Sequence, residues 1–216
     1  MSAVSDVKLA VLDYGMGNLR SVEKAFERNG VDAAKTNDAG TIRSADGLVL
    51  PGVGAFPRAM ARIRELGLDE MLRDAAGQGT PILGICLGYQ LLFESSIELG
   101  GDQGLGLLDG PVTQVPAGGR KIPHIGWAAV TWQKPSPIND GLRPGEPFYF
   151  VHSFVPEPDA DETVGTATYS GDFACVASKG NTYGVQFHPE KSSHAGLRLL
   201  QNFASICVNH REGVTP

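Results

Sequence analysis

Cys86 lies in the part of the chain whose residue types are best suited to covalent chemistry. Residues 84–90, Gly-Ile-Cys-Leu-Gly-Tyr-Gln, follow an apolar run and open a stretch with helical spacing. A strand-to-helix turn that exposes a nucleophile needs glycines at these flanking positions, because larger side chains would collide with the backbone. The thiol would then lie at a helix N-terminus, where free N–H groups and the helix dipole favour the thiolate. We therefore predict that Cys86 is a nucleophile and that the N–H of Leu87 donates to an oxyanion.

A buried apolar role is the alternative for any free cysteine, since the thiol is small and weakly polar. For Cys86 this alternative leaves the Gly-x-Cys-x-Gly turn without a purpose. For Cys175 and Cys207, which lie in an apolar segment and late in a helical pattern, it is the interpretation we favour. Three cysteines without close spacing give no disulfide framework and no zinc pattern. Reduced thiols in a cytoplasmic protein are therefore expected.

His188 and Glu190 supply the other two groups that a cysteine nucleophile needs. A thiolate requires a base that carries its proton, and the base requires a partner that fixes its tautomer. Both residues follow the apolar residues 182–187 in a His-Pro-Glu tripeptide, and parallel-sheet proteins place active sites beyond the carboxyl ends of strands. Pro189 stiffens the turn between them. An isolated His-Pro-Glu tripeptide is usually a surface turn, so this prediction depends on its combination with Cys86.

The remaining histidines have no such carboxylate beside them, and we expect them to be structural or exposed. They are His124, His152, His194 and His210. Because the histidines and cysteines show no ligand spacing, we expect neither a metal site nor a cofactor.

A second glycine-rich segment follows another apolar run. Residues 51–54, Pro-Gly-Val-Gly, would let backbone N–H groups approach a substrate carbonyl closely. A donor from Gly52 or Val53 would complement Leu87 across the reacting carbon, although a plain turn is an equally good interpretation. The segment has no GxGxxG or Walker pattern, so a phosphate site is not supported.

The elements that must position these residues alternate in the first half of the chain. Buried strands are predicted at three apolar runs, residues 7–12, 47–50 and 81–85. Helical spacing marks three further segments, residues 19–28, 59–76 and 87–94. Alternation of this kind predicts a parallel sheet with helices on both faces.

Glycines and prolines divide the second half into short apolar segments. These predict further strands, several of them antiparallel, at residues 111–115, 128–132, 148–151, 164–169, 174–177 and 182–187. A last helix is predicted at about residues 195–209. We expect one three-layer α/β domain over residues 7–210, with a mostly parallel central sheet as in flavodoxin-like folds. Residues 1–6 and 211–216 would form short tails.

The composition excludes several classes of function. The 216 residues are 42% hydrophobic, which is ordinary for a globular protein large enough to need no disulfide or metal. The net charge of −6 and the lack of a basic stripe argue against nucleic-acid binding. No apolar stretch approaches the roughly 18 residues that cross a membrane, and the N-terminal segment lacks the pattern of a secretion signal.

Together these segments resemble the class I, triad-type glutamine amidotransferases, which hydrolyse glutamine and pass ammonia to a synthase. Within that family they resemble in particular the glutaminase subunits of imidazole glycerol phosphate synthases, from histidine biosynthesis. The resemblance implies that Cys86 forms a glutamyl thioester, that His188 acts as acid and base, and that Glu190 orients the imidazole. The segments that carry it keep their order, at residues 13–18, 50–56, 84–90, 121–127, 149–153 and 188–193.

The resemblance also implies which residues contact the substrate and a partner. Gln90 would help to hold glutamine, together with the backbone near Gly52 and Ser153. Four further residues would face the synthase partner, namely Asn18, Trp127, Tyr149 and Lys191. A solvated lysine and a core tryptophan are the ordinary alternatives for two of them.

The need for a partner follows from the chemistry of ammonia. Ammonia released into water near neutral pH would be protonated and lost as a nucleophile, so a productive enzyme must channel it. This chain is too short to add a (β/α)₈ synthase domain of roughly 250 residues to a glutaminase domain. The acceptor site would therefore belong to another polypeptide. The resemblance implies a barrel-shaped cyclase that forms a heterodimer with this chain and makes imidazole glycerol phosphate and aminoimidazole carboxamide ribonucleotide.

Three alternatives remain at this point. Another amidotransferase branch is disfavoured by residues 51–54 and 191–193. A stand-alone cysteine peptidase or glyoxalase-like enzyme would need no partner and gives no reason for Gln90. A binding module without activity would not need the cysteine, histidine and glutamate together.

Overall fold

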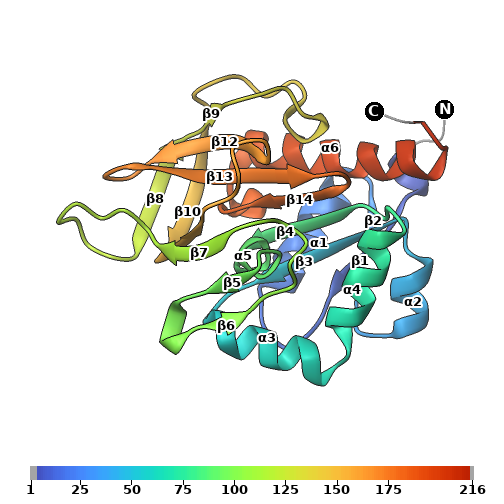
Figure 1. Ribbon diagram of the computed structural model, residues 1–216. Coiled ribbons are helices and arrows are strands. Elements are labelled where there is room, and N and C mark those ends of the chain that lie inside the picture. The colour runs from blue at the N-terminus through green and yellow to red at the C-terminus, as the bar shows by residue number, and fades with distance from the viewer. Residues whose placement is uncertain (1–3, 215–216) are drawn as a thin grey trace.

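A central eight-stranded sheet runs through the computed structural model, which describes residues 4–214 (Figure 1). Its strands follow the order β2-β1-β3-β4-β14-β13-β12-β9, and the first five are parallel to one another. The last three are antiparallel to their neighbours. The strands are Lys8–Leu12 (β1), Asp32–Thr36 (β2), Gly47–Gly52 (β3), Ile82–Cys86 (β4), Thr131–Trp132 (β9), Thr163–Thr168 (β12), Asp172–Lys179 (β13) and Thr182–Val185 (β14).

Two smaller sheets and ten helical segments complete the described part of the chain. The smaller sheets contain Ser95–Ser96 (β5), Asp102–Gln103 (β6), Pro111–Gln114 (β7), His124–Ala129 (β8), Pro147–His152 (β10) and Phe154–Pro156 (β11). The α-helices are Leu19–Arg28 (α1), Ala39–Ser44 (α2), Phe56–Glu65 (α3), Leu68–Gly77 (α4), Leu87–Leu91 (α5) and Ser193–Arg211 (α6). Short 3₁₀ helices are Val4–Asp6 (η1), Glu98–Gly100 (η2), Pro137–Asn139 (η3) and Pro189–Lys191 (η4).

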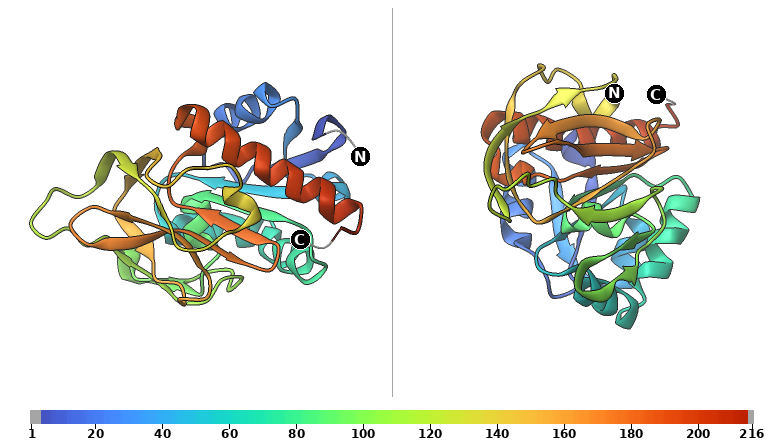
Figure 2. Two further views of the ribbon diagram at one scale, coloured as in Figure 1. Left: turned by 90° about the horizontal axis from the view of Figure 1, so that it is seen from above. Right: turned by 60° about the vertical axis from the view of Figure 1, so that its left-hand side comes forward.

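Alternating side chains along the strands hold helices against both faces of the central sheet. On β1, Leu9 and Val11 pack into one core with α1 and α6, whereas Ala10 and Leu12 pack into another with α2, α3, α4 and α5. This period of two is what buries both faces of a parallel strand. The expected three-layer α/β architecture with added antiparallel strands is therefore confirmed (Figure 2).

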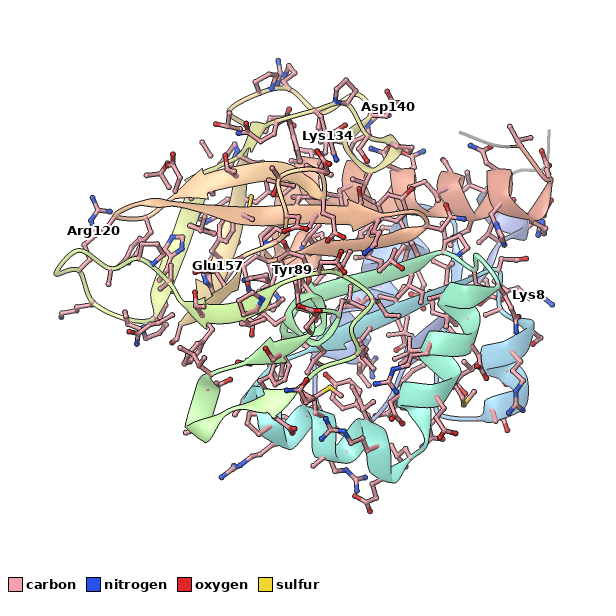
Figure 3. All side chains as sticks on the ribbon, viewed as in Figure 1. Lys8, Tyr89, Arg120, Lys134, Asp140 and Glu157 are labelled. Atoms are coloured by element: carbon pink, nitrogen blue, oxygen red, sulfur yellow. The ribbon has the colours of Figure 1, made fainter. Side chains whose placement is uncertain are left out.

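The parallel strands point toward the smaller sheets. Lys8, at the amino end of β1, lies at the opposite end of the molecule from Arg120, in the loop between β7 and β8 (Figure 3). The sheet of β8 and β10 occupies the same end as Arg120 (Figure 1). Residues at the carboxyl ends of β3, β4 and β14 consequently meet loops from the second half of the chain.

The sequence predicted some boundaries wrongly. One helix was expected over residues 59–76, but Gly67 has φ 66° and separates α3 from α4. Glycine adopts this left-handed conformation freely and commonly ends a helix. The helix expected at residues 87–94 ends at Leu91, and the strand expected at 128–132 is divided between β8 and β9.

Several elements were not predicted from the sequence, among them one strand of the central sheet and one α-helix. The strand β2 shows mostly exposed residues at the edge of the sheet, so its sequence lacks an apolar run. The helix α2 has six residues and begins where Asp38 accepts a hydrogen bond from the Thr41 N–H at 2.7 Å. Residues 1–3 and 215–216 of the expected tails lie outside the described residues. Within residues 4–214 no helix is long and apolar enough to span a bilayer.

Candidate active site

A sharp turn between β4 and α5 carries Cys86, as the two flanking glycines predicted. Cys86 has φ 55° and ψ −107°, a strained conformation for a residue with a side chain. A Cβ atom on Gly88 would overlap the Leu50 carbonyl oxygen, and one on Gly84 would press against the Gly88 carbonyl. Only glycine at both positions lets β3, β4 and α5 approach closely enough to form this turn.

A cavity of about 310 Å³ opens beside Cys86. It is lined by Val53, Gly54, Cys86, Leu87, Gln90, Glu98, Pro123, Val151, His152, Ser153, Phe154 and His188. The size suits a small ligand, and a few polar groups converge on it. The structure thus brings Cys86, His188, Gln90 and Ser153 to one cavity, although they come from distant parts of the chain.

His188 and Glu190 form a buried ion pair at the edge of this cavity. The distance from His188 Nδ1 to Glu190 Oε1 is 2.9 Å, and the side chains are 4% and 1% exposed. Burial opposes the imidazolium, but Cys86 and Glu190 outweigh it and raise the pKa of His188 to about 9. The carboxylate accepts from Nδ1, and the other nitrogen, Nε2, has no hydrogen-bond partner within residues 4–214.

Hydrogen bonds to β10 hold this histidine in place. The His188 N–H donates to the Tyr149 carbonyl at 2.9 Å. The Ser192 hydroxyl donates to the His188 carbonyl at 2.6 Å and accepts from the Tyr149 N–H at 3.0 Å. The turn after β14 is therefore fixed by the neighbouring sheet.

The predicted oxyanion donors lie around the sulfur. In the register of β3 and β4, Gly52 is the partner of Cys86, and a Cβ atom at this position would collide with the Tyr14 hydroxyl. Val53 and Leu87 line the cavity itself. Leu87 is the first residue of α5, where a backbone N–H has no partner within the helix.

Two titratable residues on the cavity wall were not assigned to the site from the sequence. Glu98 lies on η2, where its carboxylate also accepts from the Phe56 N–H at 2.8 Å. His152 was expected to be structural or exposed; its ring is paired with His124 at 2.9 Å between nitrogens and also lines the cavity. Burial lowers the pKa of His152 to about 3. His152 directly precedes Ser153, which the sequence did assign to the site, whereas Glu98 has no such neighbour.

Three of the four residues predicted to face a partner form one surface cluster. The Trp127 and Tyr149 rings are 5.9 Å apart on the paired strands β8 and β10. The Lys191 ammonium lies 6.0 Å from the Tyr149 ring. Trp127 is 54% exposed, which contradicts the alternative of a core tryptophan. Asn18 is exposed at the start of α1 and lines a separate polar cavity.

Comparison with known proteins identifies the class to which this fold and site belong. Residues 10–207 match the family model for glutamine amidotransferase class-I. A putative GMP synthase component from Thermoplasma acidophilum has the same fold, with a TM-score of 0.73, 22% identity and coverage of 95% of this chain and 96% of that one. PurLQS from Thermotoga maritima aligns with a TM-score of 0.72 and 21% identity, covering 93% and 98% of the two chains.

Curated relatives narrow the assignment. The imidazole glycerol phosphate synthase subunit HisH of Moorella thermoacetica is 49% identical over 94% of this chain and 96% of its own length. The HisH subunit of Salinibacter ruber is 45% identical over 95% and 97%. The chain therefore belongs to the class I glutamine amidotransferases and, within them, to the HisH family. The resemblance noted in the sequence is confirmed.

Proposed function

We propose that this chain hydrolyses L-glutamine to L-glutamate and ammonia with Cys86, His188 and Glu190, as part of imidazole glycerol phosphate synthase in histidine biosynthesis. The observation that supports this most directly is which ring nitrogen of His188 is bonded to Glu190 and which one is free. Glu190 occupies Nδ1 of His188 at 2.9 Å, and Nε2 remains free at a cavity that also contains the Cys86 thiol. This is the arrangement that a thiol nucleophile and its base require.

The first half of the reaction forms a thioester. In the reactive form the Cys86 proton is on Nε2 of His188, because Cys86 and Glu190 favour the imidazolium, and the thiolate attacks the side-chain carbonyl carbon of glutamine. The Leu87 N–H and an N–H from Gly52 or Val53 stabilise the oxyanion. The imidazolium then returns its proton to the amide nitrogen, the C–N bond breaks, and ammonia leaves.

The second half releases glutamate. Water attacks the thioester carbon while Nε2 of His188 accepts one of its protons. The C–S bond breaks, the sulfur leaves as a thiolate or takes the proton back, and the site is restored. Glu190 keeps the Nδ1 proton in place throughout and stabilises the positive charge on the ring.

Substrate binding uses the rest of the cavity wall. Gln90 and the backbone at Gly52 and Ser153 hold the glutamine. We add Glu98 to this set, because its carboxylate is the acidic group on the wall of the cavity and the free amino acid carries an α-ammonium group. Such charge-assisted hydrogen bonds are stronger than neutral ones.

A cyclase subunit with a (β/α)₈ barrel receives the ammonia in the cytoplasm. The cluster of Trp127, Tyr149 and Lys191 supports this heterodimer, because an exposed tryptophan beside a half-buried tyrosine is the kind of aromatic surface that is enriched at interface centres. Asn18 extends the docking face toward α1. Two hydrogen bonds connect Tyr149 with the segment that carries His188. A shift of Tyr149 when the partner binds would therefore change the position of the base.

Replacement of the nucleophile tests the proposal. In the complex with the cyclase, Cys86→Ala should reduce glutamine-dependent synthesis by several orders of magnitude and leave synthesis from ammonium salts intact. Cys175→Ala removes another buried thiol, from β13, and should keep glutamine-dependent activity. Glutamate release by Cys86→Ala at the wild-type rate would refute the assignment.

A further inference from the structure

Gln186 is a completely buried polar residue two positions before the base, and its side chain reaches the nucleophile. Its Nε2 atom lies 3.9 Å from Cys86 Sγ. We infer that Gln186 acts on the nucleophile by donating an N–H to the sulfur, and that Gln90 fixes the direction of that donor. The inference rests on the proposed role of Cys86 and adds a second side chain to its activation.

The orientation of both amides follows from a chain of hydrogen bonds that begins at the backbone. The Phe154 carbonyl can only accept, so the Gln90 atom at 2.9 Å from it must be the amide nitrogen. That nitrogen also lies 3.1 Å from the Gln186 side chain, whose nearer atom must therefore be the oxygen. The remaining Gln186 atom, which faces the sulfur, is then a nitrogen with N–H groups to donate.

The same chain of contacts determines what Gln90 presents to the substrate. Its two N–H groups are used by Phe154 and by Gln186. Only its oxygen remains, on a residue that lines the cavity. Gln90 therefore offers an acceptor to an N–H of the bound glutamine, and one side chain connects the substrate with the donor at the sulfur.

An N–H donor at this position favours the thiolate over the thiol. A hydrogen bond to the charged form of a group stabilises that form. In the resting structure the thiol proton has a different partner, the Val151 carbonyl at 3.8 Å. When the proton moves to Nε2 of His188, this carbonyl loses its donor, whereas the Gln186 N–H gains a negatively charged acceptor.

Other titratable groups around the sulfur also influence the balance between the Cys86 thiol and its thiolate. They are Tyr14, two residues after β1, His188 with Glu190 after β14, and Glu98 and His152 across the cavity. None of them changes when Gln186 is replaced. A change in the behaviour of the thiol can therefore be assigned to the missing donor.

The test is the rate of Cys86 alkylation by iodoacetamide as a function of pH, followed by mass spectrometry of the Cys86 peptide in the full chain. Gln186→Met keeps the length of the side chain and removes the donor. Hydrogen bonds to charged groups are strong, but the distance of 3.9 Å weakens this one. We therefore expect the half-point of the alkylation curve to rise by about one pH unit in Gln186→Met.

A double-mutant cycle tests the role of Gln90. Gln90→Met leaves the Gln186 amide free to rotate, so its alkylation curve should also move to higher pH. The double variant should match Gln186→Met alone, because Gln90 acts on the sulfur only through Gln186. Shifts that add in the double variant would overturn the orienting role.

Tyr89→Phe is the matched control. Tyr89 lies on α5 in the interior (Figure 3), and its buried hydroxyl has no partner among residues 4–214. Removal of the Tyr89 hydroxyl should leave the alkylation curve of Cys86 unchanged. If the Gln186→Met shift came only from disturbing the buried interior, Tyr89→Phe would shift the curve as well. Labelling of the buried Cys175 and Cys207 reports any loss of the fold.

Two outcomes decide the inference. A Gln186→Met curve that coincides with the wild-type curve overturns it. If Cys175 or Cys207 becomes labelled in Gln186→Met, that variant has lost its fold and Gln90→Met becomes the test. An alkylation curve of Gln90→Met that coincides with the wild-type curve would then overturn the inference. Alkylation does not require glutamine turnover, so either failure is distinct from a failure of the Cys86→Ala experiment.

Discussion

At the scale of single residues, the site depends on how the His188 imidazole is held between the Glu190 carboxylate and the Cys86 thiol. Glu190 contacts Nδ1, and Cys86 acts from the cavity side; both favour the imidazolium despite burial. The net result is a base whose pKa is raised to about 9. The sequence predicted these three residues, because glycine spacing and a His-Pro-Glu turn are visible along the chain.

The raised pKa makes a prediction about stability and pH. Below pH 6.5 His188 is protonated in both folded and unfolded states, and the pair with Glu190 contributes fully. As pH rises toward about 9 the unfolded state loses its proton first, so this contribution declines. Relative to Glu190→Gln, the wild-type free energy of unfolding should therefore fall across this window by about 1–3 kcal/mol.

Urea unfolding of both proteins at several pH values measures this difference. Glutamine at position 190 keeps an oxygen that accepts from Nδ1 and removes only the charge. A difference between the two proteins that stays constant from pH 6.5 to 9 would contradict the ion pair as the cause of the raised pKa.

At the scale of elements, the site depends on how closely β3, β4 and α5 approach one another. Gly88 touches the Leu50 carbonyl, and Gly52 lies against the Tyr14 hydroxyl and opposite Cys86. No side chain beyond hydrogen fits at either position. The turn that exposes the nucleophile is therefore a consequence of packing between elements as well as of the local sequence.

Two identical substitutions at different glycines test this point. Gly88→Ala should lower the free energy of unfolding by about 1–3 kcal/mol or more and displace the turn, with loss of glutamate release. Gly67→Ala meets open space and is disfavoured only by its φ of 66°. It should cost about 1 kcal/mol and leave activity unchanged. Equal losses of activity in the two variants would show that the turn does not need this packing.

The elements also show what the sequence could not predict. Apolar runs and helical spacing predicted β1, α1, β4 and α6 within a few residues, because the two strands are almost wholly buried and the two helices each bury a regularly spaced face. The exposed edge strand β2 and the six-residue α2 carry no such pattern. Glu98, His152 and Gln186 were missed for a different reason. Glu98 reaches the site only through contacts between distant segments. His152 and Gln186 are close in sequence to Ser153 and His188, but the direction of their side chains depends on tertiary packing, which the order of residues does not reveal.

At the scale of the whole molecule, the candidate site and the proposed docking face share one end of the sheet. The cluster of Trp127, Tyr149 and Lys191 lies on β8, β10 and η4, and His188 begins the same turn as η4. An ammonia-producing site needs its acceptor nearby. A partner bound at the proposed docking face would therefore lie close to the candidate site and to the turn that carries His188.

Loss of the exposed tryptophan should weaken the complex without changing the nucleophile. We expect Trp127→Ala to reduce affinity for the cyclase at least about tenfold, since aromatic residues at interface centres contribute most to binding. Val214→Ala removes a side chain of similar exposure, 51% against 54%, and should have no effect. Titration calorimetry gives the affinities. Unchanged affinity for Trp127→Ala would remove this residue from the interface.

The most direct test of the central claim is covalent labelling by an electrophilic glutamine analogue. We expect one label per chain, on the peptide that contains Cys86, with protection by excess glutamine and loss of labelling in Cys86→Ala. Labelling on Cys175 or Cys207 in the folded chain, or labelling of Cys86 that glutamine does not slow, would contradict it.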